Sequence, residues 1–307
     1  MKVENDYPLA RLTTVRAGGN AELFARPASE DELVELLAWA REQGHAVEVV
    51  GSGSNLLVAD EGVPGLVLKL DGELTALERD AERPTHVLCG GGARLPSASA
   101  KVARWGLTGL EFGINIPGTV GGAVRMNANA YGGELARVLE WVTVCTPDGP
   151  ERRTPDQLGF EYRRSNLRPG EVVARASFAL ASAEPDQVKA TLAAMRDKRR
   201  EAQPSGIKTF GSTFKNPDPG DPGADGRTAG QLLEAAGAGE LRVGGARFSA
   251  KHANFVENAG DATTADVLEL MAAGRRRVFE RFAVALEPEV QLLGGVRWPD
   301  GWELPTP

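Results

Sequence analysis

The chain has 307 residues, of which 42% are hydrophobic and 25% are charged, and its formal net charge at pH 7 is -7. This composition is typical of a globular protein, and the length suits two domains or one large domain with lobes. The negative charge argues against general nucleic-acid binding, which neutralises phosphates with basic residues. No run of about 18 apolar residues and no signal peptide is visible. We therefore expect a soluble, cytoplasmic protein that binds neither nucleic acid nor membrane.

The cysteines and histidines are scattered along the chain and show no metal-ligand spacing. Cys89 and Cys145 each lie alone in an apolar or β-like stretch. Such isolated cysteines are typical of buried thiols in a reducing compartment. The three histidines are His45, His86 and His252. The sequence therefore predicts no metal site.

The first clear helix is expected over residues 31–43. Ser29 and Glu32 form a capping-box pattern at its start, and Gly44 stands where the helix should end. Its apolar residues recur at helical spacing, so one face should pack on a core. Short β-like runs surround this helix, over residues 21–25, 46–51, 55–60 and 65–70.

Further along the chain, helices and strands mix without the βαβα rhythm of a doubly wound sheet, so we expect an α+β fold. Residues 216–228 are rich in proline, glycine and aspartate and should form a surface loop. A main boundary is expected near the end of a long helix that starts close to Glu184 and stops before Pro204. Strands are predicted over residues 86–92, 141–149, 172–180, 246–258 and 283–293, and further helices over 95–106, 229–237 and 264–282.

The sequence GSGSN, from Gly51 to Asn55, lies between two strand-like runs. Glycines allow positive φ and a close approach to a ligand, and successive amide groups in such a turn can hold an anion. The loop therefore suits a pyrophosphate, although a plain tight hairpin explains it equally well. It is not a G-x-G-x-x-G fingerprint, because Leu56 takes the sixth position and a strand follows. No glycine-lysine-serine or glycine-lysine-threonine of a Walker loop follows either.

A second glycine-rich stretch spans residues 114–134, and three further glycines stand at positions 90–92. A turn alone would use one or two glycines. A chain that passes close to an extended planar ligand explains this number better. The glycines of the second stretch are Gly118, Gly121, Gly122, Gly132 and Gly133.

Together, GSGSNLLVADEG and GLTGLEFGINIPGTVGGAVRMNANAYGGEL resemble the FAD-binding domain of UDP-N-acetylenolpyruvoylglucosamine reductases. The resemblance implies an FAD-binding domain of the vanillyl-alcohol-oxidase type over residues 1–190, with lobes of about 1–80 and 81–190. A smaller α+β substrate-binding domain is expected over residues 191–307. No histidine lies in either loop, so we expect noncovalent FAD. The resemblance assigns the pyrophosphate to Gly51, Ser52, Gly53, Ser54 and Asn55, and the rest of the cofactor to Gly118, Thr119, Gly121, Gly122 and Ala123.

Reduction of an enol ether requires a hydride donor for one carbon and a proton donor for the other. Negative charge then develops toward the carboxylate of the substrate, and a cation or an acid must stabilise it. Three short motifs match the family and would supply these groups.

EYRRSN places Arg163 opposite the substrate carboxylate, and GSTFKNP makes Ser212 the proton donor. LEPEV makes Glu289 the residue that polarises the intermediate or positions the serine, with Glu287 as the neighbour most easily confused with it. Taken singly, these residues could be a surface salt bridge, a turn serine and a solvated glutamate. Their order, downstream of both glycine loops, favours the catalytic interpretation. Lys215 and Asn216 are further candidates for substrate binding.

The sequence departs from the family at TFGSTFKNP: the family often has an alanine-glycine-serine run before the phenylalanine, and this chain has Phe210 and Gly211 before the serine. The interval between Tyr162 and Ser212 is short, as in the compact class that lacks an extra substrate-covering loop. We therefore expect no substrate-contacting tyrosine from such a loop.

The resemblance implies an NADPH-dependent flavoenzyme that converts UDP-N-acetylglucosamine enolpyruvate into UDP-N-acetylmuramate, a step of peptidoglycan precursor synthesis. NADPH would reduce FAD first, and the enolpyruvyl substrate would then be reduced. An alternative is an FAD-dependent oxidase of the wider superfamily that acts on an alcohol or a sugar. A second alternative is a flavin- or nucleotide-binding module without turnover.

Overall fold

The computed structural model describes residues 2–300 and 302–304, and the chain divides into two compact units. The first unit consists of residues 1–6, 22–52 and 64–201. The second consists of residues 7–21, 53–63 and 202–307, so it combines two N-terminal segments with the C-terminal part of the chain. The domain boundary expected near residue 190 stays a prediction.

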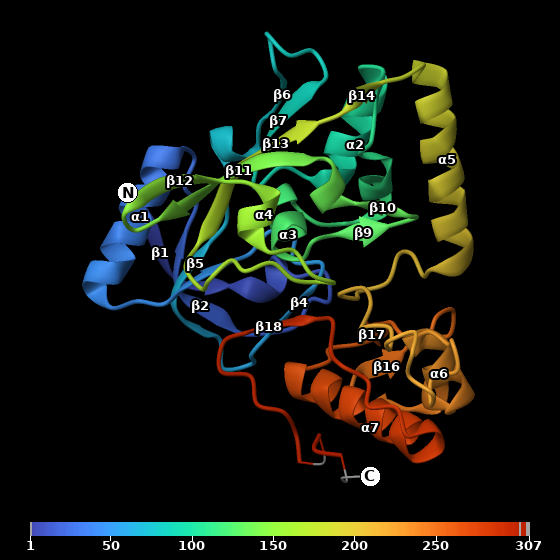
Figure 1. Cartoon of the computed structure of the whole chain (residues 1–307). Helices are drawn as coiled ribbons and strands as arrows, with labels where there is room; N and C mark the ends of the chain where they lie inside the picture. The colour runs from blue at the N-terminus through green and yellow to red at the C-terminus, as the bar shows by residue number, and fades with distance from the viewer. Residues whose placement is uncertain (1, 301, 305–307) are drawn as a thin grey trace. The chain divides into compact units, whose positions relative to one another are not determined.

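The first unit contains a four-stranded sheet of order β1-β2-β5-β3 and a five-stranded antiparallel sheet of order β12-β11-β13-β7-β6. Figure 1 shows β11 and β13 at the centre of the larger sheet. The strands of the four-stranded sheet are β1 Val3–Pro8, β2 Asn20–Ala25, β3 Val47–Val49 and β5 Val63–Leu68. Those of the five-stranded sheet are β6 Leu77–Arg79, β7 His86–Gly90, β11 Leu139–Thr146, β12 Gly149–Arg153 and β13 Val172–Ala179.

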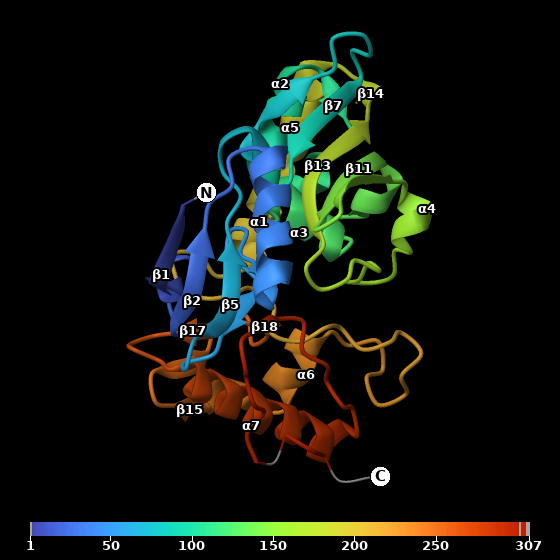
Figure 2. The same cartoon turned by 90° about the vertical axis from the view of Figure 1, so that its left-hand side faces the viewer.

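Helix α1, Glu30–Gln43, packs between these two sheets (Figure 2). The hydroxyl of Ser29 accepts a hydrogen bond from the main-chain N–H of Glu32, and Gly44 ends the helix in the left-handed conformation, which confirms both predicted ends. The Glu32 carboxylate accepts from the N–H of Ala28 instead of Ser29, so only one arm of the capping box forms as predicted. The apolar face of α1 is buried against β5, β11 and β13.

The remaining helices of the first unit cover the larger sheet or extend its connections. Their bounds are α2 Leu95–Arg104, α3 Val120–Arg125, α4 Pro155–Leu158 and α5 Pro185–Ala202. Short strand pairs are formed by β8 Leu107–Thr108 with β14 Ala181–Ser182, and by β9 Asn129–Ala130 with β10 Gly133–Glu134. The 3-10 helices of this unit are Gly72–Thr75, Glu111–Asn115 and Leu135–Arg137.

The second unit is built around α7, Thr264–Phe282, whose bounds match the predicted helix. It packs with α6, Ala229–Ala235, and with a three-stranded antiparallel sheet around one apolar core (Figure 1). The sheet strands are β15 Arg242–Val243, β16 Ala246–Phe248 and β17 Val256–Asn258. A parallel pair is formed by β4 Leu56–Val58 and β18 Gln291–Leu293, and the 3-10 helices are Leu9–Arg11 and Ala238–Glu240.

Two predicted strands of the second unit are wrong in their extent. Residues 246–258 form two strands, β16 and β17, joined by a loop. Residues 283–293 were expected to be one strand, but only Gln291–Leu293 forms a ladder. Pro288 cannot donate a ladder hydrogen bond, and this segment makes isolated pairings with residues 213–215 instead.

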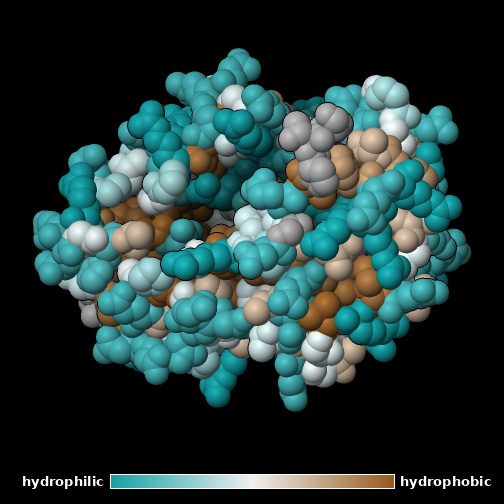
Figure 3. Space-filling model, turned by 90° about the horizontal axis from the view of Figure 1, so that it is seen from below, coloured by the Kyte–Doolittle hydropathy of each residue, from teal (hydrophilic) through white to brown (hydrophobic). Residues whose placement is uncertain are grey.

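Most of the described strand pairs are antiparallel, and helices alternate with strands irregularly, which confirms the α+β class. The face shown in Figure 3 carries mostly hydrophilic residues with smaller hydrophobic areas between them. In the described part of the chain, no helix combines the length and the apolar character needed to cross a membrane.

Candidate active site

Four backbone segments meet closely in the first unit because glycine occupies contact positions. The N–H of Gly121 donates to the carbonyl of Gly91 at 2.7 Å. A Cβ atom at Gly51 would lie 2.6 Å from Oγ1 of Thr119, and one at Gly91 would lie 1.8 Å from the carbonyl oxygen of Val173. A larger residue would therefore separate the segments. The glycines predicted to approach a ligand thus also allow the backbone itself to pack.

These segments line a groove made of two adjoining hollows of about 90 and 520 Å³. The hollows share five lining residues, which makes them parts of one groove: Gly51, Lys69, Leu70, Gly92 and Thr119. The smaller hollow is completed by residues of β3 and β13 together with Arg125 and Glu171, and the larger one by Arg26, Arg94 and a mixture of polar and apolar residues. We call the whole the cofactor groove.

Basic side chains surround the larger hollow of the cofactor groove. The ammonium of Lys69 donates to the carbonyl of Gly51 at 2.6 Å. Burial lowers the pKa of Lys69, and the nearby charges of Arg26 and Arg94 lower it further. An anionic ligand in the hollow would relieve this repulsion. No sequence motif indicated Arg26, Lys69 or Arg94.

Most of the predicted cofactor residues of the first unit line the groove: Gly51, Ser52, Thr119, Gly121 and Gly122. The hydroxyl of Ser52 donates to the carbonyl of Pro117. The other two predicted residues have different surroundings.

Ala123 is 3% exposed and packs in the core behind the groove. Gly118 accepts a hydrogen bond from the N–H of Leu95 at 3.0 Å and does not line either hollow.

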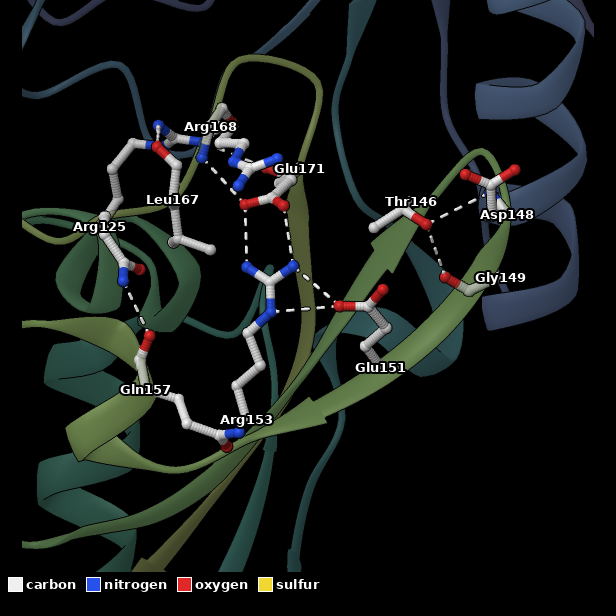
Figure 4. A network of polar contacts seen from close by, with 11 residues as sticks. Arg125, Thr146, Asp148, Gly149, Glu151, Arg153, Gln157, Leu167, Arg168 and Glu171 are labelled. Carbon is white, nitrogen blue, oxygen red and sulfur yellow. Dashed lines mark hydrogen bonds and ion pairs between the residues drawn. The ribbon is translucent and has the colours of Figure 1, made fainter.

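One wall of the smaller hollow is held by two arginines (Figure 4). Arg153, from β12, forms two hydrogen bonds with the carboxylate of Glu171, at 2.9 and 2.7 Å. Arg125, at the end of α3, donates to main-chain carbonyls of the same wall, including that of Glu171 at 3.0 Å. The hydrogen bond from Arg153 lowers the pKa of Glu171, so the ion pair is present at neutral pH. Bidentate arginine-carboxylate pairs fix geometry well, and this pair therefore orders the wall.

The remaining residues of the first glycine loop belong to the second unit. The carbonyl of Gly53 accepts from the N–H of Thr14 at 3.0 Å. The side-chain amide of Asn55 donates to the carbonyl of Glu289 at 3.2 Å, and the N–H of Gln291 donates to the carbonyl of Asn55 at 3.0 Å. The structure thus joins a predicted cofactor residue to the segment of a predicted catalytic residue. Ser54 lies between these two anchored positions.

Ser212 and Glu289 lie on neighbouring segments of the second unit, and both are half-buried. The N–H of Glu289 donates to the carbonyl of Thr213 at 2.9 Å. The same two segments pair again between Phe214 and Pro288. On its other side, Ser212 pairs with Phe255. The structure therefore brings together two residues that are far apart in sequence.

Asn254, which no sequence motif indicates, fixes the segment that carries Ser212. It is 4% exposed. Its side chain bonds both main-chain groups of Phe214, accepting from the N–H at 2.9 Å and donating to the carbonyl at 2.8 Å. Its own carbonyl accepts from the N–H of Thr213 at 2.8 Å. Only the tertiary pairing of these segments reveals this function.

The residues at the departure from the family pattern have clear structural places. Phe210 is fully buried in the core of the second unit. Gly211 follows with φ of 86°, a conformation that favours glycine. The buried Phe210 ring and the turn at Gly211 thus determine the direction of the chain just before Ser212.

Lys215 and Asn216 both have structural partners. The ammonium of Lys215 pairs with the carboxylate of Glu287 at 3.1 Å. The side-chain oxygen of Asn216 accepts from the N–H of Ala229, the first residue of α6, at 3.1 Å. Their assignment to substrate binding stays a prediction.

Arg163 lies in the first unit, in a turn between Glu161 and Arg164. Its φ is 57°, which is uncommon for a residue with a side chain. Its guanidinium donates to Oδ1 of Asn129 at 2.9 Å and lies 5.0 Å from the centre of the Tyr162 ring. Residues held in such strained conformations cluster at functional sites, which supports a function for this turn.

Two buried side-chain atoms of the described residues lack a hydrogen-bond partner: Oδ1 of Asn127 and Oγ1 of Thr213. Thr213 follows Ser212 directly, and Asn127 donates to the carbonyl of Glu161 in the Arg163 turn at 3.2 Å. Unsatisfied buried polar atoms are rare and call for an explanation.

Comparisons with known proteins agree with this geometry. A family model described as "UDP-N-acetylenolpyruvoylglucosamine reductase, C-terminal domain" matches residues 203–293, and one described as "FAD binding domain" matches residues 21–154. UDP-N-acetylenolpyruvoylglucosamine reductase 2 of Symbiobacterium thermophilum is 43% identical over 299 residues, which are 97% of this chain and 94% of that protein. The Myxococcus xanthus reductase is 44% identical over 294 residues, 95% of this chain and 93% of that protein.

A solved structure is also similar along nearly the whole chain. The crystal structure of UDP-N-acetylenolpyruvylglucosamine reductase from Thermus caldophilus matches with a TM-score of 0.81 and 37% identity. The match covers 95% of this chain and 99% of that chain. The similarity therefore includes the FAD-binding part and the C-terminal part.

Proposed function

Because the chain belongs to the family of UDP-N-acetylenolpyruvoylglucosamine reductases, we propose that it reduces the enolpyruvyl group of UDP-N-acetylglucosamine enolpyruvate to give UDP-N-acetylmuramate. It is an FAD-dependent oxidoreductase that uses NADPH and serves peptidoglycan precursor synthesis. The full-length similarity supports this activity, and the alternative of a sugar or alcohol oxidase is not favoured.

FAD fits the residues of the cofactor groove. Glycines of the first loop and of α3 line the groove without side chains that would fill it. The basic residues Arg26, Lys69 and Arg94 suit the negative charge of a pyrophosphate. The valines of β3 and β13 in the smaller hollow offer an apolar surface to a ring system. No histidine lines either hollow, which supports noncovalent binding. When bound, FAD would supply the hydride for the substrate, with NADPH as its source.

The residues of the chain would supply the other requirements of the reaction. Arg163 binds the carboxylate of the substrate and stabilises the negative charge that develops there. Ser212 donates a proton to the carbon that bears this carboxylate; an enolate is a strong base, so a hydroxyl suffices. Glu289 lies on the segment next to Ser212 and polarises the intermediate or orients the hydroxyl.

The observation that carries these roles is the pairing of the Ser212 segment with the Glu289 segment, which is also bonded to Asn55 of the cofactor loop. Proton donor, polarising acid and cofactor loop are thereby connected through main-chain hydrogen bonds. A substrate-binding function of Lys215 and Asn216 is proposed with them. We also propose that the substrate is a nucleotide sugar and that the enzyme acts in the cytoplasm.

The function is tested by following NADPH oxidation by the FAD-loaded protein with and without UDP-N-acetylglucosamine enolpyruvate. The expected result is oxidation that depends on the substrate and yields UDP-N-acetylmuramate, identified by mass spectrometry. Oxidation that instead follows the oxygen concentration, without this product, would support an oxidase.

A further inference from the structure

The guanidinium of Arg163 contacts the hairpin formed by β9 and β10. Asn129, in β9, accepts a hydrogen bond from a terminal nitrogen of Arg163 at 2.9 Å. The main chain of Asn129 is itself paired with Glu134 in β10, so the acceptor sits on an ordered strand pair. Asn129 was not among the residues that the sequence motifs single out.

We propose that Asn129 is a positioning residue, which orients the Arg163 guanidinium toward the carboxylate of the substrate, and that Asn127 fixes the turn that carries Arg163. This inference rests on the proposed function. Asn129 and Asn127 would both act through Arg163, without contacting the cofactor or the reacting atoms.

The chemistry of the acceptor suits this purpose. An arginine side chain is long and rotatable, whereas its guanidinium is planar and recognises a carboxylate best with two parallel N–H groups. The hydrogen bond to Asn129 and the contact to the Tyr162 ring at 5.0 Å both restrict the plane of the group. A neutral amide oxygen does so without cancelling the positive charge. An aspartate at this position would compete with the substrate for the same cation.

Asn127 holds the turn from inside the protein. It is 1% exposed. Its amide nitrogen donates to Oε1 of Glu134 at 2.7 Å and to the carbonyl of Glu161 at 3.2 Å. Glu161 also exchanges two main-chain hydrogen bonds with Arg164 across the turn. The turn that holds Arg163 at φ of 57° is therefore anchored to the same hairpin as the guanidinium.

The test compares two ligands that differ in the carboxylate. UDP-N-acetylglucosamine lacks the enolpyruvyl carboxylate that Arg163 would bind. In Asn129→Ala we expect the affinity for the enolpyruvyl substrate to fall about tenfold, as for a lost hydrogen bond to a charged group. Binding of UDP-N-acetylglucosamine, bound FAD and flavin reduction by NADPH should stay at the parent level. Asn129→Asp has the same shape and should lose at least as much affinity for the substrate, because it neutralises the arginine.

Two further variants make the outcome decisive. Arg164→Met removes an exposed neighbouring charge, 73% exposed at its side chain, and should leave both affinities unchanged. In an Arg163→Met background, Asn129→Ala should cause no further loss, because Asn129 acts through Arg163.

An equal loss for both ligands in Asn129→Ala, or a full further loss in the Arg163→Met background, would overturn the positioning role. No carboxylate-specific loss in Arg163→Met itself would overturn both this inference and the assigned function of Arg163. A parent protein that binds neither ligand would instead refute the proposed function.

Discussion

The side-chain amide of Asn55 donates a hydrogen bond to the main-chain carbonyl of Glu289, 3.2 Å away. The next hydrogen bond runs the other way, from the N–H of Gln291 to the carbonyl of Asn55 at 3.0 Å, and opens the parallel pairing of β4 with β18. The glycine loop and the terminal glutamate motif are thus neighbours in the second unit. The connection uses main-chain groups of Glu289, so a change of its carboxyl group leaves the connection intact.

Replacement of Glu289 by glutamine should therefore separate chemistry from folding. We expect an unchanged melting temperature and a fall in substrate reduction of about 10²-fold, as for loss of a catalytic acid or polarising group. The comparison is Glu287→Gln, whose side chain is 72% exposed and pairs with Lys215. It should lower kcat far less. A larger loss of kcat in Glu287→Gln would mean that the catalytic glutamate of this motif is misassigned.

Ser212→Ala should affect only the second half of the reaction. Without a proton donor, reduction of the enolpyruvyl substrate should fall by about 10²–10⁴-fold, while NADPH should reduce the bound flavin at the parent rate. Stopped-flow absorbance measures the two steps separately. Ser205→Ala, an exposed serine of the preceding loop, is the matched control. Equal turnover in Ser212→Ala and the parent would refute the assigned role.

Arg153→Met should weaken the retention of FAD. It removes both hydrogen bonds from Arg153 to Glu171 and leaves that carboxylate without an ion-pair partner of this geometry in the wall of the smaller hollow, bonded to the N–H of Arg168 (Figure 4). We expect the dissociation constant of FAD, measured by fluorescence titration, to rise about tenfold. Arg83→Met is the control, because it breaks another ion pair of the first unit, with Glu140 at 2.6 Å, that lies outside the groove. Similar FAD affinities in the two variants would contradict a wall held by Arg153.

The same ion pair predicts how FAD retention depends on pH. The pKa of Glu171 is lowered in the folded protein, chiefly by the hydrogen bond from Arg153. The stabilisation is therefore complete above the unfolded pKa of about 4.3 and is lost as the pH falls through the lower folded value. FAD affinity should decrease over this acidic range. Glu171→Gln should have weaker affinity at neutral pH and should lose this part of the pH dependence.

The two cysteines should be inert in the native protein. Both are buried and free, and burial raises the pKa of Cys89 and of Cys145 to about 12. Because the thiolate is the reactive form, neither should be alkylated by iodoacetamide at pH 8, while both should react after denaturation. Mass spectrometry counts the modified residues. Rapid native alkylation of either cysteine would show that its surroundings open to solvent.

Local sequence signals predicted the elements that depend on local chemistry. The helix over 31–43 was predicted because Ser29 stands at its start, Gly44 stands at its end and apolar residues recur at helical spacing. The strand after the glycine loop was predicted from its short run of apolar residues. By contrast, the strand expected over 283–293 failed because Pro288 interrupts the ladder and the segment pairs with the residues that follow Ser212.

Only those residues of the candidate site that belong to family motifs could be predicted from the sequence. Ser212 and Glu289 are adjacent in the structure, but nothing in their spacing predicts this pairing. Asn254 and Asn129 form hydrogen bonds with segments that are distant in sequence, so these contacts exist only after the chain has folded. The sequence around Lys69 indicates only the polar end of a strand. Its burial beside Arg26 and Arg94 results from the tertiary fold and could not be predicted.

The most direct test of the central claim follows the flavin absorbance of the purified protein without oxygen. NADPH is added first, and UDP-N-acetylglucosamine enolpyruvate is added after the flavin has been reduced. We predict that the flavin is reoxidised by this substrate and that UDP-N-acetylmuramate appears in equal amount. A flavin that stays reduced until oxygen is admitted would contradict the account.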